Sequence, residues 1–224
     1  MDSIDSSLKL NNYYGSAEWE KNVKEKEKLY TKYNKYVERN EEVLDSDYIV
    51  EHNIICDKNN RYIGDKCKLL RNKELIFEWT NYYSKSLLHK IINHNNGRRY
   101  FIYNEDLYGY SVVDLDSKEH INYIPYESYL SPSSNQYKDT FIFCDAFYNK
   151  YNSKIAIEGC IWAAPYSIIV FDFKNPLDIK TIKEWKDVQD IESTEYHDID
   201  FFKWKQNNLI TKNHKDEKEY FECS

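Results

Sequence analysis

A pattern of short apolar segments joined by Asn-rich turns recurs along this chain, and it constrains the fold more than any other feature. The clearest copy has apolar segments at 89–92, 99–103 and 110–115, with the turn His94-Asn95-Asn96-Gly97 between the first two. Similar copies follow at offsets of 55 residues, beginning at Cys144 and Ile199, and an earlier one is centred on the turn 57–60. Asn and Gly suit such tight turns because they tolerate a positive φ. Short apolar runs separated by polar turns predict antiparallel β-structure.

Two copies continue into a fourth segment, which we predict to be a strand near 120–124 and near 178–182. In the same two copies the third strand ends at an aspartate, Asp114 or Asp172, after a run of apolar residues. Four antiparallel strands repeated about four times over 48–224 resemble the blades of a β-propeller with a WD-like layout, although the Gly-His and Trp-Asp dipeptides of that pattern are absent. The resemblance implies a mainly β, propeller-like fold of antiparallel four-stranded repeats. A β-sandwich, an open barrel or a plain meander would give a similar pattern.

The N-terminal part differs from the rest and predicts an amphipathic helix over 16–44. Apolar residues recur on one helical face at Trp19, Val23, Tyr30, Tyr33, Val37 and Leu44. Ser16 is suited to the N-cap position of this helix. The chain therefore divides into an N-terminal helical arm, 1–47, and a β-repeat domain, 48–224. We expect the apolar face to pack on its own domain; the alternative is a structural or regulatory subunit whose helix docks into an oligomer.

Charge and hydropathy exclude several classes of protein. The 224-residue chain has a formal net charge of −7, which argues against a basic nucleic-acid-binding domain. Its longest apolar stretch, 160–171, contains Pro165 and Ser167 and is shorter than the ~20 residues that a membrane span needs. The first ten residues lack the features of a secretory signal, and the five scattered cysteines fit reduced thiols better than a disulfide framework. We therefore expect a cytoplasmic protein that binds neither nucleic acid nor membrane.

Sequence motifs for metal binding and catalysis are absent. His52 and Cys56 are four residues apart and Cys67 follows, but no Cys-x-x-Cys, His-x-x-x-His or His-Glu-x-x-His pattern occurs. We interpret them as structural cysteines and a histidine beside a turn, so we expect no metal and no other cofactor. The chain also lacks a Gly-x-Ser-x-Gly motif, a P-loop and a dinucleotide-binding glycine motif. These absences favour a protein that is not an enzyme, and no catalytic residue is assigned.

Antiparallel topology places the long connections of every copy at one end of the strands. These connections are 104–109, 126–138, 159–165 and 185–197, and long loops on a rigid scaffold often carry binding residues. The first has two acids and no base, and the last has four acids against one lysine, so this end carries most of the negative charge. We predict partner contacts from its acids and aromatic residues, namely Glu105, Asp106, Tyr108, Trp162, Trp185, Asp187, Asp190, Glu192 and Glu195.

The preferred functional hypothesis is a protein-interaction module whose acidic aromatic loops bind a protein partner. A basic partner is favoured because opposite charges steer association around aromatic anchors. One version is an immunity-type antagonist that masks a basic partner such as a nuclease. The alternative is a hydrolase or lyase for a small polar or sugar-like substrate, with Glu105, Asp106, Glu158 and His197 as acid–base groups. A deep cavity with paired carboxylates would favour the enzyme, whereas a flat surface would favour binding.

Overall fold

The computed structural model describes residues 12–34, 37–81, 87–129, 140–162, 164–184, 186–188, 198–213 and 215–223. Its helices and strands, in chain order, are α1 (Ala17–Tyr33), β1 (Val37–Val43), β2 (Tyr48–Cys56), β3 (Tyr62–Arg71), β4 (Glu74–Asn81), β5 (His89–Asn93), β6 (Arg99–Tyr103), β7 (Tyr110–Asp114), β8 (His120–Tyr123), η1 (Tyr126–Tyr129), β9 (Phe141–Asn149), β10 (Lys154–Ile161), β11 (Ser167–Asp172), η2 (Ile179–Glu184), β12 (Lys186–Asp187), β13 (Ile199–Lys205), β14 (Asn208–Asn213) and β15 (Lys218–Glu222). The described strands form four antiparallel sheets. A mainly β fold with an N-terminal helix is therefore confirmed.

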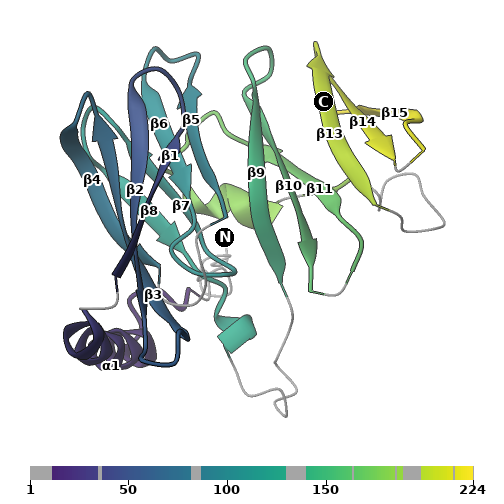
Figure 1. Ribbon diagram of the computed structural model, residues 1–224. Helices are drawn as coiled ribbons and strands as arrows, with labels where there is room; N and C mark the ends of the chain where they lie inside the picture. Colours follow the sequence, from purple (N-terminus) through teal and green to yellow (C-terminus); the bar gives the residue numbers. More distant parts are fainter. Residues whose placement is uncertain are drawn as a thin grey trace, which may run out of the picture.

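Each sheet is built from strands that follow one another along the chain: β1–β4, β5–β8, β9–β12 and β13–β15. Figure 1 shows the four sheets side by side in chain order, with an apolar layer between each pair of neighbours. The layer between the first and second sheets includes Leu69 and Phe101. The next layer includes Val112 and Ile157, and the last includes Ile168 and Leu209. β7 is buried along its whole length because the second sheet has such a layer on both faces. The described strands close into neither a barrel nor a ring.

The second sheet follows the repeat predicted from the sequence most closely. β6 and β7 begin at Arg99 and Tyr110, where the apolar segments begin, and β8 occupies the predicted fourth strand. β5 pairs with β6 so that His89 is opposite Tyr103, and the turn between them closes through a hydrogen bond of 3.1 Å from the Gly97 amide to the His94 carbonyl oxygen. The alternation of apolar segments and tight turns is thus sufficient to locate this sheet.

A tight turn in each of the four sheets uses a positive φ at one residue. The residues that supply it before β3, β6, β10 and β14 are Asn60, Gly97, Ser153 and Gln206. The expected preference for Asn and Gly is therefore right for the first two turns and wrong for the last two. In the turn before β10, the Asn149 side chain instead accepts a hydrogen bond from the Tyr151 amide at 3.0 Å, so the asparagine stabilises the turn without adopting the left-handed conformation itself.

The N-terminal helix is shorter than predicted. α1 ends at Tyr33, with Asn34 as its C-cap, and residues Val37–Val43 form β1 instead of further helical turns. β1 pairs antiparallel with β2, so that Val37 is opposite Ile55. The apolar spacing that continues through Val37 is compatible with a helix, but pairing with β2 satisfies the backbone of this segment and determines its structure. The first sheet therefore begins before residue 48.

The predicted fourth strand of the third sheet is also wrong in position. Residues near 178–182 belong to the short helix η2, and the fourth strand is the two-residue β12. Asp178 explains the difference, because its side chain accepts the Lys180 amide at 3.0 Å and its carbonyl oxygen accepts the Thr181 amide at 3.2 Å. Ile182 remains buried in the apolar layer, so the segment keeps its core contact while changing its backbone conformation.

The helix packs on its own domain, as expected. Ser16 is the N-cap, and its Oγ accepts the Trp19 amide at 3.1 Å. α1 contacts β2 and β3, and an ion pair of 3.2 Å joins Glu27 to Lys66 of β3. None of the described helices is long and apolar enough to span a membrane.

Candidate functional site

The two best-described long connections lie at the same end of the sheets, as the antiparallel topology predicts. Leu107 and Tyr108 of the connection after β6 pack with Ile142 of β9, and Cys160 near the end of β10 packs against the same cluster. Most of the other two connections, 130–138, 185 and 189–197, lies outside the described residues. The predicted contact residues Trp185, Asp190, Glu192 and Glu195, together with the alternative acid–base residue His197, fall in this part.

The structure buries the two acids of the first connection instead of exposing them. Glu105 is 7% exposed and Asp106 is 5% exposed. Glu105 accepts a hydrogen bond from the Asn122 side chain, and Asp106 accepts one from the Tyr129 hydroxyl group and one from the Leu107 amide. Burial raises the pKa of Glu105 to about 8, with repulsion from Asp106 adding to the effect and the Asn122 hydrogen bond opposing it.

Asp106 also lines a cavity between α1 and the long-loop end. Burial raises the pKa of Asp106 to about 6, although the bonds from Tyr129 and Leu107 oppose this rise. The cavity has a volume of about 190 Å³ and is walled by aromatic side chains that include Tyr13 and Trp19. A carboxyl group with a raised pKa beside an aromatic cavity has the properties of a general acid.

The remaining predicted contact residues differ widely in exposure. Tyr108 is 9% exposed, and Asp187 is 7% exposed and accepts a hydrogen bond of 2.5 Å from the Ser167 hydroxyl group. Trp162, at the start of the connection after β10, is 64% exposed. Of the predicted contact residues that the structure describes, only Trp162 presents most of its side chain to solvent.

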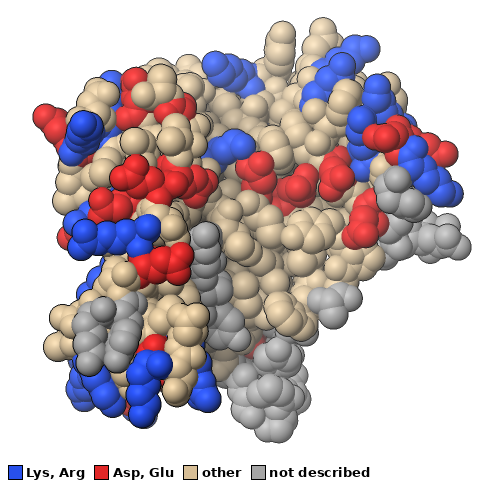
Figure 2. All heavy atoms as spheres, in the orientation of Figure 1, with Lys and Arg blue, Asp and Glu red and all other residues tan. Residues whose placement is uncertain are grey.

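Trp162 belongs to a surface that extends beyond the loops predicted from the sequence. We call this surface the acidic aromatic face; it consists of Asp145, Glu158, Trp162, Tyr166, Asp198 and Asp200. Glu158 of β10 is opposite Asp145 of β9 and accepts the amide of the residue after Asp200, while Trp162 and Tyr166 lie in the connection from β10 to β11. Tyr166 is 41% exposed, and its amide donates to Asp198 Oδ1 at 2.7 Å. Figure 2 shows a row of acidic side chains across the side of the molecule where β9 and β13 lie in Figure 1. The acids come from strands as well as from loops, which is why loop composition alone did not find them.

The pKa of Glu158 reflects the negative potential of this face. Its pKa is raised first by burial and then by repulsion from Asp200 and Asp145, while the Phe201 amide, which donates to Oε2 at 2.8 Å, and Lys90 oppose the rise. Lys90 forms an ion pair of 2.8 Å with Asp145, so one carboxylate is partly compensated. The face therefore keeps an excess of negative charge beside two exposed aromatic rings.

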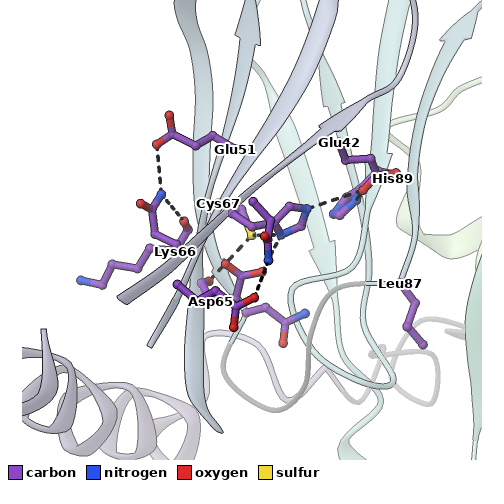
Figure 3. Close-up of polar contacts among 12 residues, drawn as sticks. Glu42, Glu51, Asp65, Lys66, Cys67, Leu87 and His89 are labelled. Carbon is purple, nitrogen blue, oxygen red and sulfur yellow. Dashed lines mark hydrogen bonds and ion pairs between the residues drawn. The ribbon is translucent and has the colours of Figure 1, made fainter. Parts of the chain in front are cut away.

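A second group of polar side chains lies between the first and second sheets, as Figure 3 shows. His52 Nδ1 is 2.6 Å from Asp65 Oδ2 and 3.6 Å from the Cys67 sulfur atom. Glu42 Oε2 is 2.8 Å from His89 Nδ1 and 3.5 Å from His52 Nε2. The side chains come from β1, β2, β3 and β5, and we call them the histidine–carboxylate cluster.

Burial and mutual contact shift the pKa values within this cluster. The contacts that Glu42 makes with His52 and His89 lower its pKa to about 2. Burial opposes a charge on His52, but Asp65 and Glu42 prevail and raise its pKa to about 9. Burial raises the pKa of the Cys67 thiol well above its usual range, and Asp65 adds to this effect. The charges of Glu42, His52 and Asp65 therefore act on one another, although the cluster lies away from the acidic loops.

The sequence did not reveal the cluster because its members follow no short spacing. His52 lies in the middle of β2 and not beside a turn, which corrects the interpretation made from the sequence, and Cys56 at the end of β2 does not join the cluster. The available signal was the hairpin of β2 and β3, in which His52 is paired with Cys67. All five cysteines are free thiols.

Comparison with known protein families finds no family that matches this chain, and no curated protein matches it either.

Proposed function

We propose that this protein is a protein-interaction module that binds a basic protein partner through the acidic aromatic face. The observation that carries the proposal is the placement of Glu158, which is opposite Asp145 in the strand pairing and is repelled by both Asp200 and Asp145. A cationic side chain of a partner would relieve that repulsion. Trp162 and Tyr166 provide exposed aromatic anchors of the type that dominates binding energy at interfaces.

The scaffold that presents this face is, in our proposal, propeller-like. The support is the succession of antiparallel meanders packed face to face in chain order, which is how blades are arranged. A scaffold with an apolar layer between successive sheets holds β9, β10 and β13 rigidly, so the acids and aromatic rings of the face are prearranged for a partner. The proposed setting is the cytoplasm, which agrees with five free thiols.

The nature of the partner follows from the charge of the face. A basic protein, such as a nuclease whose substrate is itself an anion, has the complementary surface, and masking it would make this chain an immunity-type antagonist. Charge attraction of this kind accelerates association and weakens as salt screens it. The proposal therefore requires binding that falls as ionic strength rises.

The test is affinity capture from native lysate with the full chain as bait, followed by measurement of Kd for the captured protein. Trp162→Ala and Asp200→Lys should each weaken binding by about tenfold or more. Tyr151→Ala is the matched control for Trp162→Ala, because Tyr151 is 79% exposed but lies in the turn before β10. Asp116→Lys is the control for charge reversal at another exposed aspartate.

Two results would contradict the proposal. One is a captured protein that binds the Trp162→Ala and Asp200→Lys variants as tightly as it binds the control variants. The other is a Kd that stays constant between low and high salt, because charge steering is screened under those conditions.

A second candidate function is a hydrolase or lyase that uses the cavity beside Asp106. The raised pKa of Asp106 and the aromatic walls formed by Tyr13 and Trp19 favour it. Glu158 belongs to the acidic aromatic face, so of the sequence-derived acid–base residues only Asp106 lines this cavity within the described part of the chain. Turnover of small glycosides or esters that Asp106→Asn abolishes would support this function, and absence of turnover across such a panel would dismiss it.

A further inference from the structure

Three potential metal ligands from separate strands meet between the first and second sheets. Glu42 of β1, His52 of β2 and His89 of β5 each offer one ligand atom, and these atoms all lie within 4.8 Å of one another. We propose that these three residues form a binding site for a divalent transition-metal ion, with Zn²⁺ as the reference ion. This inference does not depend on the acidic aromatic face or on the partner proposed for it.

The distances between the ligand atoms suit a single ion. Glu42 Oε2 is 2.8 Å from His89 Nδ1 and 3.5 Å from His52 Nε2. Ligands around a tetrahedral Zn²⁺ with bonds of about 2.0–2.2 Å are separated by about 3.3 Å. An ion between these atoms therefore needs the two separations to change by a few tenths of an ångström, which side-chain rotation supplies.

Asp65 contacts the ring nitrogen of His52 that lies away from the proposed ion. The Asp65 side chain is fully buried, and its Oδ2 is 2.6 Å from His52 Nδ1. A carboxylate in this position holds a proton on Nδ1, so an ion that displaces the other ring proton finds the lone pair on Nε2. Nε2 is the atom that is directed toward Glu42. Carboxylate–histidine–metal arrangements of this kind are common in metal sites.

The ring nitrogen of His52 that faces the proposed ion is buried and lacks a hydrogen bond. His52 is 2% exposed, and its Nε2 makes no hydrogen bond, since its contact with Glu42 Oε2 is an ion pair of 3.5 Å. A buried polar atom without a partner costs free energy, and native proteins rarely leave one without a reason. A metal ion held between His52, His89 and Glu42 would use this nitrogen as a ligand.

Cys67 lies on the other side of His52 and is not a ligand in this arrangement. Its sulfur atom is 3.6 Å from His52 Nδ1, the nitrogen that Asp65 already occupies. His52, Asp65 and Cys67 also lie close enough to one another to form an alternative ligand set. The bond between Asp65 and Nδ1 argues against that set, because one nitrogen cannot both share a proton with Asp65 and bind the ion. Substitution of Cys67 therefore distinguishes the two ligand sets.

The proposed site has an entry path and room for a further ligand. Glu42 is 47% exposed, and Glu42 and His89 line a groove of about 310 Å³ that also borders Leu87 and Asp145. Two histidines and one carboxylate leave at least one coordination position for water or another small ligand. A bound ion would also tie β1 and β2 of the first sheet to β5 of the second, so it should stabilise the fold.

The test uses the full chain stripped of metal with a chelator and then titrated with ZnCl₂ by calorimetry. We expect one ion per chain with a Kd of about 1 μM or lower. CoCl₂ replaces ZnCl₂ in a parallel titration, because the visible absorption of Co²⁺ reports its ligands. Nitrogen and oxygen ligands should give visible bands without the near-ultraviolet charge-transfer band of a thiolate. Zn²⁺ should also raise the melting temperature of the stripped protein.

The variants separate the two ligand sets. Glu42→Gln removes an anionic ligand from a half-exposed position and should weaken Zn²⁺ binding by more than tenfold, while Asp65→Asn should weaken it by about 10–100-fold through the second shell. Cys67→Ala should bind within about threefold of the unmodified chain, since Cys67 is placed outside the ligand set. His120→Gln is the control for removal of a surface histidine, and it should bind like the unmodified chain.

Several results would overturn the proposal. The first is no saturable Zn²⁺ binding by the stripped full chain up to millimolar concentration. The second is a thiolate charge-transfer band with Co²⁺, or loss of binding in Cys67→Ala, either of which would assign the ion to the other ligand set. The third is unchanged affinity in folded Glu42→Gln. The Co²⁺ spectrum of the unmodified chain decides between the ligand sets even where a variant does not fold.

Discussion

Tyr30 of α1 lies directly over Gly64 of β3, and this contact leaves no space for a side chain on the strand. A Cβ atom at Gly64 would be 2.0 Å from the Tyr30 hydroxyl oxygen and 2.5 Å from two ring carbons. Tyr30 is 2% exposed, so its ring cannot move aside without losing buried contacts. This pair therefore determines how closely the helix approaches the first sheet.

Gly64→Ala should lower the free energy of unfolding by about 1–3 kcal/mol, because overpacking forces the helix away from β3. Urea denaturation measures the effect. The cost should shrink in a Tyr30→Leu background, where the hydroxyl group and ring edge are absent. Strictly additive costs in the double variant would show that the two residues do not oppose each other.

The stability of the protein should depend on the ionisation of Glu105. Its pKa is raised to about 8 in the folded state, so between pH 5 and 8 the folded protein holds a proton that the unfolded chain has released. The free energy of unfolding must therefore fall as pH rises through this window. Glu105→Gln should remove this contribution, so the variant gains stability relative to the unmodified chain as pH rises from 5 to 8.

Chemical denaturation at a series of pH values measures the difference between the two proteins. Glu119→Gln is the matched control, since Glu119 is exposed in the connection before β8. A difference between Glu105→Gln and the unmodified chain that stays constant with pH would contradict the assignment.

Asp114 should matter more to stability than Asp172, which ends the equivalent strand of the third sheet. Asp114 is fully buried, accepts Arg98 Nη1 at 2.5 Å, and accepts the Asp116 amide at 2.9 Å. Burial opposes its charge, but these bonds prevail and lower its pKa. Asp114→Asn should cost about 1–3 kcal/mol, because it removes the charge that Arg98 faces.

Asp172→Asn provides the comparison, since the Asp172 side chain is 42% exposed and its ion pair with Lys174 is longer, at 3.8 Å. We expect a loss below about 1 kcal/mol there. The lowered pKa of Asp114 also means that its contribution is present above the ordinary carboxyl pKa and is lost as pH falls. Equal costs for the two variants in thermal denaturation would refute the distinction.

The fourth sheet should loosen when its aromatic contact with the third is removed. Phe201 of β13 stacks on Phe147 of β9 with ring centroids 3.8 Å apart, and Trp204 Nε1 donates to the Phe147 carbonyl oxygen at 2.9 Å. Phe201→Ala should cost on the order of 2 kcal/mol and speed amide hydrogen exchange in β13–β15.

Phe202→Ala is the control, because the neighbouring ring lies beneath lysine ammonium groups such as that of Lys218 and is not part of this stack. Exchange in β6 and β7 should stay slow in both variants, since the second sheet is enclosed by two apolar layers. Faster exchange throughout the protein in Phe201→Ala would mean that the sheets unfold as one unit.

Local patterns in the sequence were sufficient to predict a strand where the strand and its turn follow each other in the chain. The second sheet is the best example, since β6 and β7 begin at the residues that open the apolar segments. The same reasoning failed at Val37–Val43, whose spacing suits a helix, because the partner strand β2 decides its conformation. It also failed at η2, where Asp178 redirects the backbone.

The candidate sites were harder to predict because burial and register depend on contacts between distant residues. Composition located acids at the long-loop end, but Glu105 and Asp106 turn inward, and the acids of the acidic aromatic face come partly from β9, β10 and β13. Residues far apart in the chain form that face, and no loop sequence contains all of them.

The sequence by itself determined the alternation of apolar strands and tight turns, and with it a mainly β chain of antiparallel strands, because these features are local. Only the tertiary structure decided which side chains share a face. The pairing of Cys56 with Tyr62 would, if continued evenly, put Lys66 opposite His52, but the register shift at Ile55 and Cys56 brings Cys67 there instead. Since neighbouring residues of a strand point to opposite faces, this single irregularity turns Asp65 toward His52 and creates the histidine–carboxylate cluster.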